Sequence, residues 1–151
     1  MPSASDLLGD RRRVLVTGGA GFIGGAVVRR LLRETTVTVF NLDKMGYASD
    51  LSSIEEVLSE LGGAANDRHR LQQVDLTDAA AVEAAVREAD PDLVMHLAAE
   101  SHVDRSISGP GVFIESNVNG TYNLLQAVRG HYEGLSGEPV SYTHLTLPTS
   151  G

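Results

Sequence analysis

Apolar residues recur along this chain in two alternating patterns, short continuous runs and longer amphipathic stretches. The continuous runs predict buried strands near residues 13–17, 36–41, 70–74 and 92–98. The stretches with apolar residues three and four positions apart predict helices near residues 22–34, 51–61, 78–88 and 111–132. Strands that alternate with helices form right-handed crossovers and a parallel sheet covered on both faces. The pattern therefore predicts an α/β fold with a doubly wound parallel sheet.

Glycines crowd the junction between the first predicted strand and the first predicted helix. Gly19, Gly21 and Gly24 form a GxGxxG pattern inside the segment Val14–Gly25. In this pattern one glycine permits the tight turn, one lets backbone approach a pyrophosphate, and one lets the helix pack closely on its strand. The anion then meets free N–H groups at the positive end of the helix. The segment predicts dinucleotide binding by an incomplete Rossmann-type sheet of about four strand–helix units.

An acidic residue ends the second apolar run at the position that a dinucleotide site requires. Asp43 follows residues 37–42, about 20 residues after the glycine pattern, where a carboxylate accepts the adenosine ribose hydroxyls. A carboxylate repels a 2′-phosphate, so Asp43 predicts NAD rather than NADP. Lys44, the next residue, is a cation that tolerates a phosphate, and it weakens this preference.

Composition narrows the classes of partner. The formal net charge of −8 argues against nucleic acid and anionic membranes as partners. The chain has no cysteine, which excludes disulfides and a thiol nucleophile. No segment has the length and apolarity of a membrane span, and the acidic start is unlike a signal peptide, so we expect a cytoplasmic protein without a membrane partner.

Two further segments carry a family resemblance. Asp43–Leu51 reads DKMGYASDL after the second predicted strand, and Val94–Ile107 reads VMHLAAESHVDRSI from the fourth. Together with the glycine turn, they strongly resemble the dTDP-glucose 4,6-dehydratases, which are extended short-chain dehydrogenase/reductase proteins. The resemblance covers about residues 12–138 and implies NAD as cofactor, dTDP-glucose as substrate and a homodimer when the protein is full length.

The resemblance also implies a set of cofactor contacts. At the pyrophosphate turn they are Gly18, Gly19, Gly21, Phe22, Ile23 and Gly24, and at the ribose they are Asp43, Lys44, Met45 and Gly46. Asp75 and Leu76 lie beside the adenine, and Leu97, Ala98, Ala99, Glu100 and Ser101 lie on the nicotinamide side. Ser116, at the start of the fourth helix, completes the set. Ser101 also touches the sugar nucleotide in that family. Gly46 and Ser116 stand where threonine is usual, and Ser49 stands where glycine is usual.

The implied reaction is a redox-neutral elimination. NAD⁺ takes a hydride from C4 of the glucose while a tyrosine, its pKa lowered by a lysine, removes the O4 proton; an Asp/Glu pair then expels the 6-hydroxyl as water, and the hydride returns to C6. The only lysine here is Lys44, and no tyrosine precedes a lysine by four positions. The Thr-Asp-Glu strand segment is absent too. We therefore assign no catalytic residue and expect the NAD-binding portion of a lyase, without turnover.

Rival interpretations stay open at this point. Within enzymes they are an epimerase or decarboxylase of the same superfamily, or a dehydratase of GDP-mannose or a UDP-sugar; outside enzymes, a non-catalytic NAD-binding module. The segment His102–Ser106 favours the dehydratase. His102 and Asp104 resemble an acid/base pair, but loop roles are favoured for both, because adjacency alone makes no proton relay. His96, inside a strand, is interpreted as a packed histidine, and no zinc-ligand spacing occurs.

The domain organisation follows from these segments. We expect a flexible extension over residues 1–11, the NAD-binding Rossmann portion over 12–138, and a non-native tail over 139–151. Val140–Thr149 match, residue for residue, one reading frame of a transposase adapter used in shotgun sequencing libraries. The alternative is a genuine divergent tail rich in serine and threonine. If the tail is an artefact, the fourth strand should be an exposed apolar edge.

Overall fold

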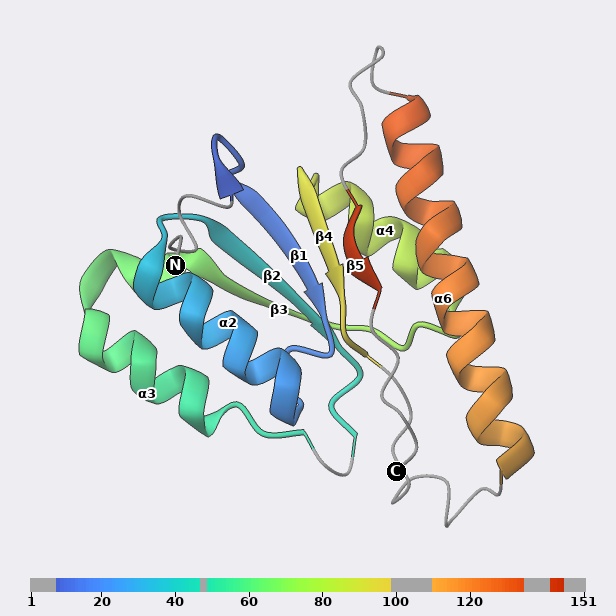
Figure 1. Cartoon of the computed structure of the whole chain (residues 1–151), viewed down its shortest axis with the longest axis horizontal. Coiled ribbons are helices and arrows are strands. Elements are labelled where there is room, and N and C mark those ends of the chain that lie inside the picture. The colour runs from blue at the N-terminus through green and yellow to red at the C-terminus, as the bar shows by residue number, and fades with distance from the viewer. Residues whose placement is uncertain (1–7, 47–48, 99–109, 135–141, 146–151) are drawn as a thin grey trace.

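A single five-stranded parallel sheet forms the centre of the molecule (Figure 1). The computed structural model describes residues 8–46, 49–98, 110–134 and 142–145, with side chains for all of these except 110–117 and 142–145. The strands are β1 (Arg13–Thr17), β2 (Thr38–Asp43), β3 (His69–Gln73), β4 (Leu93–His96) and β5 (Tyr142–Leu145). Their order is β3-β2-β1-β4-β5, so successive strands run outward to one side of β1 and then to the other. This reversal confirms the predicted doubly wound sheet and puts its switch point between β1 and β4.

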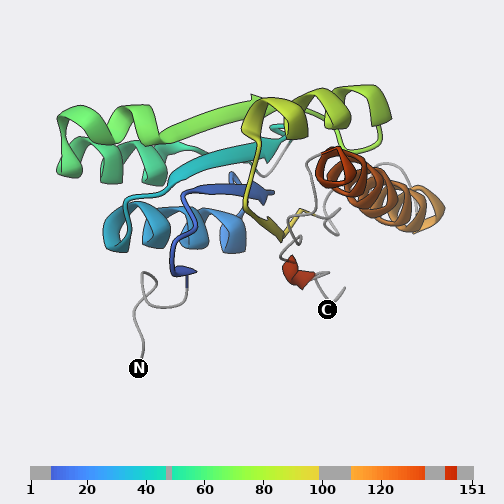
Figure 2. The same cartoon turned by 90° about the horizontal axis from the view of Figure 1, so that it is seen from above.

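Helices cover the sheet on both faces (Figure 2). The helices are α2 (Phe22–Glu34), α3 (Ser52–Leu61), α4 (Ala79–Ala89) and α6 (Pro110–Glu133), and a short 3-10 helix, η1 (Gly63–Arg68), follows α3. One face carries α2 and α3, and the other carries α4 and α6. No helix in the described part of the chain has the length and apolarity to cross a membrane.

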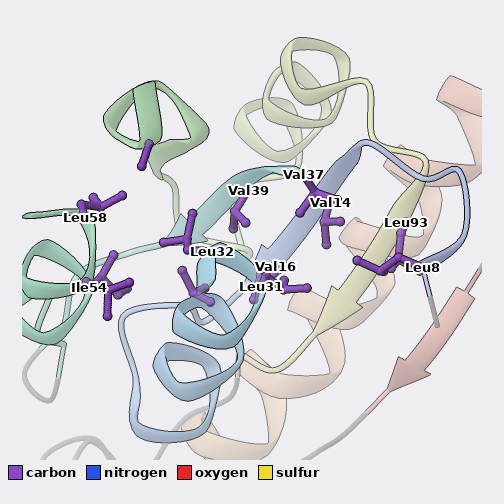
Figure 3. Close-up of a cluster of buried hydrophobic side chains, with 13 residues drawn as sticks. Leu8, Val14, Val16, Leu31, Leu32, Val37, Val39, Ile54, Leu58 and Leu93 are labelled. Atoms are coloured by element: carbon purple, nitrogen blue, oxygen red, sulfur yellow. The ribbon is translucent and has the colours of Figure 1, made fainter. Parts of the chain in front are cut away.

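Alternation along β1 divides the core into two layers. Val14 and Val16 point towards α2 and α3, whereas Leu15 between them points towards α4 and α6, and all three are fully buried. Figure 3 shows the first layer, a buried cluster that contains the two valines together with Leu31, Leu32 and Ile54. A strand buried on both faces reads as a continuous apolar run, which is why the sequence showed no alternation here.

The helix at the glycine turn lies where the sequence predicted it, whereas β3 is shifted by one residue and β2 and β4 differ by two. β2 spans Thr38–Asp43 instead of 36–41, because the Thr35 hydroxyl donates to the Leu31 carbonyl (2.6 Å) and accepts the N–H of Val37 (3.3 Å) ahead of the strand. β4 ends at His96 rather than at residue 98, because the N–H groups of Leu97 and Ala98 turn towards the Thr17 side chain. Both differences arise from side-chain hydrogen bonds that periodicity does not report.

A strand forms in the segment that the sequence assigned to a non-native tail. β5 pairs in parallel with β4, with an irregularity in register between Val94 and Met95. The expectation that β4 is an exposed edge is therefore wrong, since an open strand offers a row of N–H and C=O groups to any extended segment within reach. The identity of residues 139–151 as a non-native tail stays a prediction.

Candidate functional site

The glycine turn begins at Gly18, directly after β1. Gly18 has φ of +73°, its N–H donates to the Leu42 carbonyl (2.8 Å), and its own carbonyl accepts from the Gly21 N–H (3.1 Å). A Cβ atom at Gly18 would lie 2.7 Å from the Cα of Ala98. The residue that needs glycine for the tight turn is therefore Gly18, outside the GxGxxG triad, and it also brings the end of β4 against the turn.

The triad glycines serve different purposes. A Cβ at Gly24 would lie 2.6 Å from the carbonyl carbon of Gly18, and one at Gly19 would lie 2.8 Å from Nδ2 of Asn41. These two glycines permit close packing within the protein. Gly21 is less confined, because its Cβ would meet only the Gly18 carbonyl oxygen, at 3.3 Å.

Helix α2 presents an uncapped N-terminus beside this turn. Gly21 is its N-cap, without a side-chain hydrogen bond, and no acidic residue occupies the first turn. Phe22 is 94% exposed and Ile23 is 54% exposed, so side chains of the core do not cover the helix end. Unpaired N–H groups and the helix dipole together make such an end a site for a phosphate or another anion.

Asp43 lies at the carboxyl end of β2 and is 8% exposed. Its Oδ2 accepts the N–H of Ala20 (2.9 Å), and its Oδ1 accepts the N–H of Met45 (2.8 Å) and the hydroxyl of Ser49 (3.1 Å). A carboxylate oxygen can accept two hydrogen bonds, so with one donor among the described residues Oδ2 retains one acceptor position. Asp43 thus ties the glycine turn to the loop after β2 and keeps capacity for one ligand hydroxyl.

The backbone N–H and carbonyl of Ala20 are held by the last residue of β2 and by the loop that follows it. Its N–H donates to Asp43, and its carbonyl accepts the N–H of Asp50 (2.9 Å). Inside that loop Met45 adopts φ of +60°, a left-handed conformation that is uncommon outside glycine. Lys44 and Gly46 are exposed on either side of it. Ala20 is a site residue that the motif did not single out, because its role depends on backbone atoms.

Asp75 and Leu76 follow β3, beside the end of β2. Burial alone would raise the pKa of Asp75, but hydrogen bonds from Thr77 and the nearby charge of Lys44 lower the pKa below its ordinary value. The N–H and hydroxyl of Thr77 lie 2.9 Å and 2.8 Å from Asp75 Oδ1. The Leu76 carbonyl accepts a 2.8 Å hydrogen bond from Asn123 Nδ2 on α6. The predicted adenine-side residues therefore lie between the end of β2 and α6.

A buried polar chain crosses the switch point. Thr17 Oγ1 lies 3.0 Å from the N–H of Leu97, 3.1 Å from the N–H of Ala98 and 2.6 Å from Nδ1 of His96. Nε2 of His96 lies 3.0 Å from the hydroxyl of Thr121 on α6. Burial lowers the pKa of His96 to about 4, so the imidazole is neutral near pH 7. His96 is thus packed, as predicted, while the roles of Thr17 and Thr121 were missed.

The remaining predicted residues fall outside this description. Ala99, Glu100 and Ser101 lie outside the described residues, as do His102 and Asp104, and the side chain of Ser116 is not described either. Across the described ranges, His, Asp and Glu side chains form no group of three or more that could hold a metal ion.

Comparison with known proteins decides the family. The sequence model of a family described as GDP-mannose 4,6 dehydratase matches residues 15–142. This chain belongs to the GDP-mannose 4,6 dehydratase family. The match begins within β1 and extends to the first residue of β5, so it includes the glycine turn, Asp43 and the polar chain at the switch point.

The curated relatives of this member of the GDP-mannose 4,6 dehydratase family confirm the resemblance seen in its motifs. It is 50% identical over 127 residues to the dTDP-glucose 4,6-dehydratase of Neisseria meningitidis serogroup B, an alignment that covers 84% of this chain and 34% of that protein. It is 46% identical over 126 residues to dTDP-glucose 4,6-dehydratase 1 of Escherichia coli, covering 83% and 33%. The chain spans about a third of the length of the curated relatives it matches.

Solved structures show the same architecture. A dTDP-glucose 4,6-dehydratase from Streptomyces venezuelae, crystallised with NAD bound, matches with a TM-score of 0.66 and 41% identity, over 80% of this chain and 36% of its own. A UDP-glucose 4-epimerase from Stenotrophomonas maltophila, also with NAD bound, matches with a TM-score of 0.66 and 30% identity, over 80% and 34%. The GDP-mannose 4,6 dehydratase family member described here therefore has the Rossmann-type fold that its sequence predicted.

Proposed function

We propose that this chain binds NAD at the carboxyl edge of its sheet and that the full-length protein is a dTDP-glucose 4,6-dehydratase. The observation that carries NAD binding is the uncapped N-terminus of α2 beside Asp43, which keeps one acceptor position on Oδ2. The helix end suits a pyrophosphate, and the carboxylate suits a ribose hydroxyl. Both groups lie next to the switch point, where doubly wound sheets bind their ligands.

The proposed contacts are those that the family resemblance implies, from Gly18 in the turn to Ser116 in α6. Two solved relatives with NAD bound support this choice of cofactor. The names of the curated relatives support dTDP-glucose as the substrate. When bound, NAD would supply hydride acceptance and return, while the described residues would hold its pyrophosphate and adenosine.

We expect no turnover by this chain alone. Its only lysine is Lys44, so no Tyr-x-x-x-Lys pair is present in the sequence. The chain would bind and orient the cofactor, and the proton-transfer groups would belong to the rest of a full-length enzyme. A homodimer and a cytoplasmic location stay predictions of the sequence.

An epimerase is the second candidate, because the UDP-glucose 4-epimerase structure matches with the same TM-score of 0.66 as the dehydratase. Recovery of the uninterrupted gene across the codon for Glu138 tests the dehydratase against both alternatives, because a continuation without the Thr-Asp-Glu strand leaves the epimerase. A continuation with a Thr-Asp-Glu strand and a Tyr-x-x-x-Lys helix supports the dehydratase and justifies an assay for a 4-keto sugar. A native stop codon after Gly151 would leave a non-catalytic NAD-binding module.

Cofactor binding is tested by calorimetric titration of this chain with NAD⁺ and NADP⁺. We expect NAD⁺ to bind at least about tenfold more tightly, because the Asp43 carboxylate repels a 2′-phosphate. Asp43→Asn should reduce that preference. Asp92→Asn is the matched control, since the Asp92 carboxylate accepts the N–H groups of Arg12 (2.9 Å) and Arg13 (3.1 Å) where β1 begins, at the opposite edge of the sheet. Absence of NAD⁺ binding by the wild-type chain would refute the proposal.

A further inference from the structure

The hydroxyl of Thr17 has each of its hydrogen-bonding positions used. A hydroxyl oxygen accepts two hydrogen bonds and donates one. The N–H groups of Leu97 and Ala98 can only donate, and they lie 3.0 Å and 3.1 Å from Thr17 Oγ1. The hydroxyl proton therefore points at the remaining neighbour, Nδ1 of His96, which lies 2.6 Å away and must accept it.

This arrangement fixes the tautomer of His96. A neutral imidazole carries one N–H group, and since Nδ1 accepts, the proton is on Nε2. Nε2–H then donates to Oγ1 of Thr121, 3.0 Å away on α6. Burial keeps His96 neutral, with a pKa of about 4, in agreement with a ring that donates at one nitrogen and accepts at the other.

The consequence lies in the backbone that follows β4. The N–H of Leu97 is also 3.2 Å from the Thr17 carbonyl, so Thr17 holds this peptide through two of its oxygens. A Cβ at Gly18 would lie 2.8 Å from the nitrogen of Ala98 and 2.7 Å from its Cα, so no side chain separates the glycine turn from this segment. The Thr17 hydroxyl thus holds the segment after β4 in direct contact with the turn.

We propose that His96 is a positioning residue for the nicotinamide half of the bound dinucleotide: by orienting the Thr17 hydroxyl, it holds Leu97 and Ala98 against Gly18 on the β4 side of the crevice. This inference rests on the proposed function, because it concerns the same crevice. The adenosine half belongs to the β2 side, where Asp43 bonds to Ala20 and to the following loop and shares no atom with the His96 chain. Loss of the hydrogen bond between Thr17 and His96 should therefore weaken binding of the nicotinamide half more than binding of the adenosine half.

Two substitutions separate the two nitrogens of the imidazole. His96→Asn places an amide oxygen near the former Nδ1 and keeps an acceptor for Thr17. His96→Gln places an amide near the former Nε2 and keeps a partner for Thr121, but it offers Thr17 no acceptor. We expect His96→Asn to bind NAD⁺ within about twofold of wild type and His96→Gln to bind about tenfold more weakly, with AMP affinity changed less than about twofold in both.

Controls distinguish orientation from a general loss of packing. Thr17→Val preserves shape and removes the hydroxyl with its three hydrogen bonds, so it should weaken NAD⁺ binding at least as much as His96→Gln does. The double variant should show no further loss relative to Thr17→Val, because the hydrogen bond between Thr17 and His96 is already absent from that variant. His131→Gln is the matched control, since Nε2 of His131 bonds Asp90 (2.7 Å), a residue just beyond the C-terminus of α4, and this contact should not influence NAD⁺ affinity.

The tautomer has its own readout. In a two-bond proton–nitrogen spectrum of the nitrogen-15-labelled chain at neutral pH, His96 should give the pattern of an Nε2–H imidazole. An Nδ1–H ring or an imidazolium would overturn the inference, as would equal losses of NAD⁺ and AMP affinity in His96→Gln. A wild-type chain that binds neither ligand refutes the proposed function and the inference with it, whereas NAD⁺ binding unaltered in His96→Gln refutes the inference alone.

Discussion

At the scale of single residues, the buried side chain of Asn41 restricts which residue can occupy the glycine turn. Asn41 is fully buried in β2, its Nδ2 donates to Nε2 of His69 (3.2 Å), and its Oδ1 has no hydrogen-bond partner among the residues that the structure describes. The side chain occupies the space that a Cβ at Gly19 would need. Part of the glycine pattern therefore reflects a buried amide rather than a ligand, and a sequence motif does not separate the two causes.

His96 makes the free energy of unfolding depend on pH, in a pH range above the pKa values of the carboxyl groups. Its pKa is about 4 when folded, against an ordinary value of 6.5, so between these values the unfolded chain binds a proton that the folded chain does not. Stability should fall as the pH drops from 6.5 towards 4, by up to about 3 kcal/mol. Burial also lowers the pKa of His69, with partial compensation by the charge of Glu55, and this adds to the same trend.

Urea unfolding between about pH 4 and 7 measures this dependence. His96→Asn should show a smaller slope, by about the uptake of one proton on unfolding. The pKa values of Asp50 and Asp75 are also lowered, but these groups lose their stabilising charge only below their ordinary value of 3.8. If the unfolding free energies of wild type and His96→Asn depended equally on pH, other groups would be responsible for the loss of stability in acid.

At the scale of elements, α2 packs on the glycine turn through backbone alone. Gly24→Ala would place a methyl group onto the Gly18 carbonyl, which cannot move without disturbing its bonds to the turn. We expect a destabilisation of about 1–3 kcal/mol, measured by urea unfolding. Gly130→Ala in α6 is the matched control: its new Cβ meets nothing within 4 Å, so higher helix propensity should stabilise the chain by about 0.5–1 kcal/mol. Equal effects of the two substitutions would contradict the packing role of Gly24.

The elements were predictable wherever local chemistry and tertiary structure agree. The bounds of α2 follow from the glycine turn at one end and the β-branched Thr35 at the other, and they match the predicted 22–34. The packing position of α6 was harder to predict from the sequence. Gly120 packs against Leu76, and Asn123 donates a hydrogen bond to the Leu76 carbonyl, which lies 47 positions earlier in the sequence. Hydrogen bonds between residues that are far apart in the sequence produce no periodic pattern from which they could be predicted.

At the scale of the whole molecule, β5 is the element whose contribution can be tested most directly. Deletion of residues 139–151 removes β5 and leaves β4 as an unpaired parallel edge. We expect a lower thermal midpoint and concentration-dependent association, measured by calorimetry and by sedimentation. Deletion of residues 146–151 alone retains β5 and serves as the control. A shortened chain that stays monomeric with an unchanged midpoint would show that β5 contributes no stability.

The two hydrogen bonds at Ala20 join the glycine turn and the loop after β2 into one frame. The Ala20 N–H bonds Asp43 and its carbonyl bonds Asp50, so neither segment can shift without breaking a bond to the other. A ligand that touches both segments would find their relative placement set before it arrives. The loss of conformational entropy on binding is then small, because the ordering has already taken place during folding. Preorganisation of this kind favours long residence of the ligand, since dissociation would release little disorder in the protein.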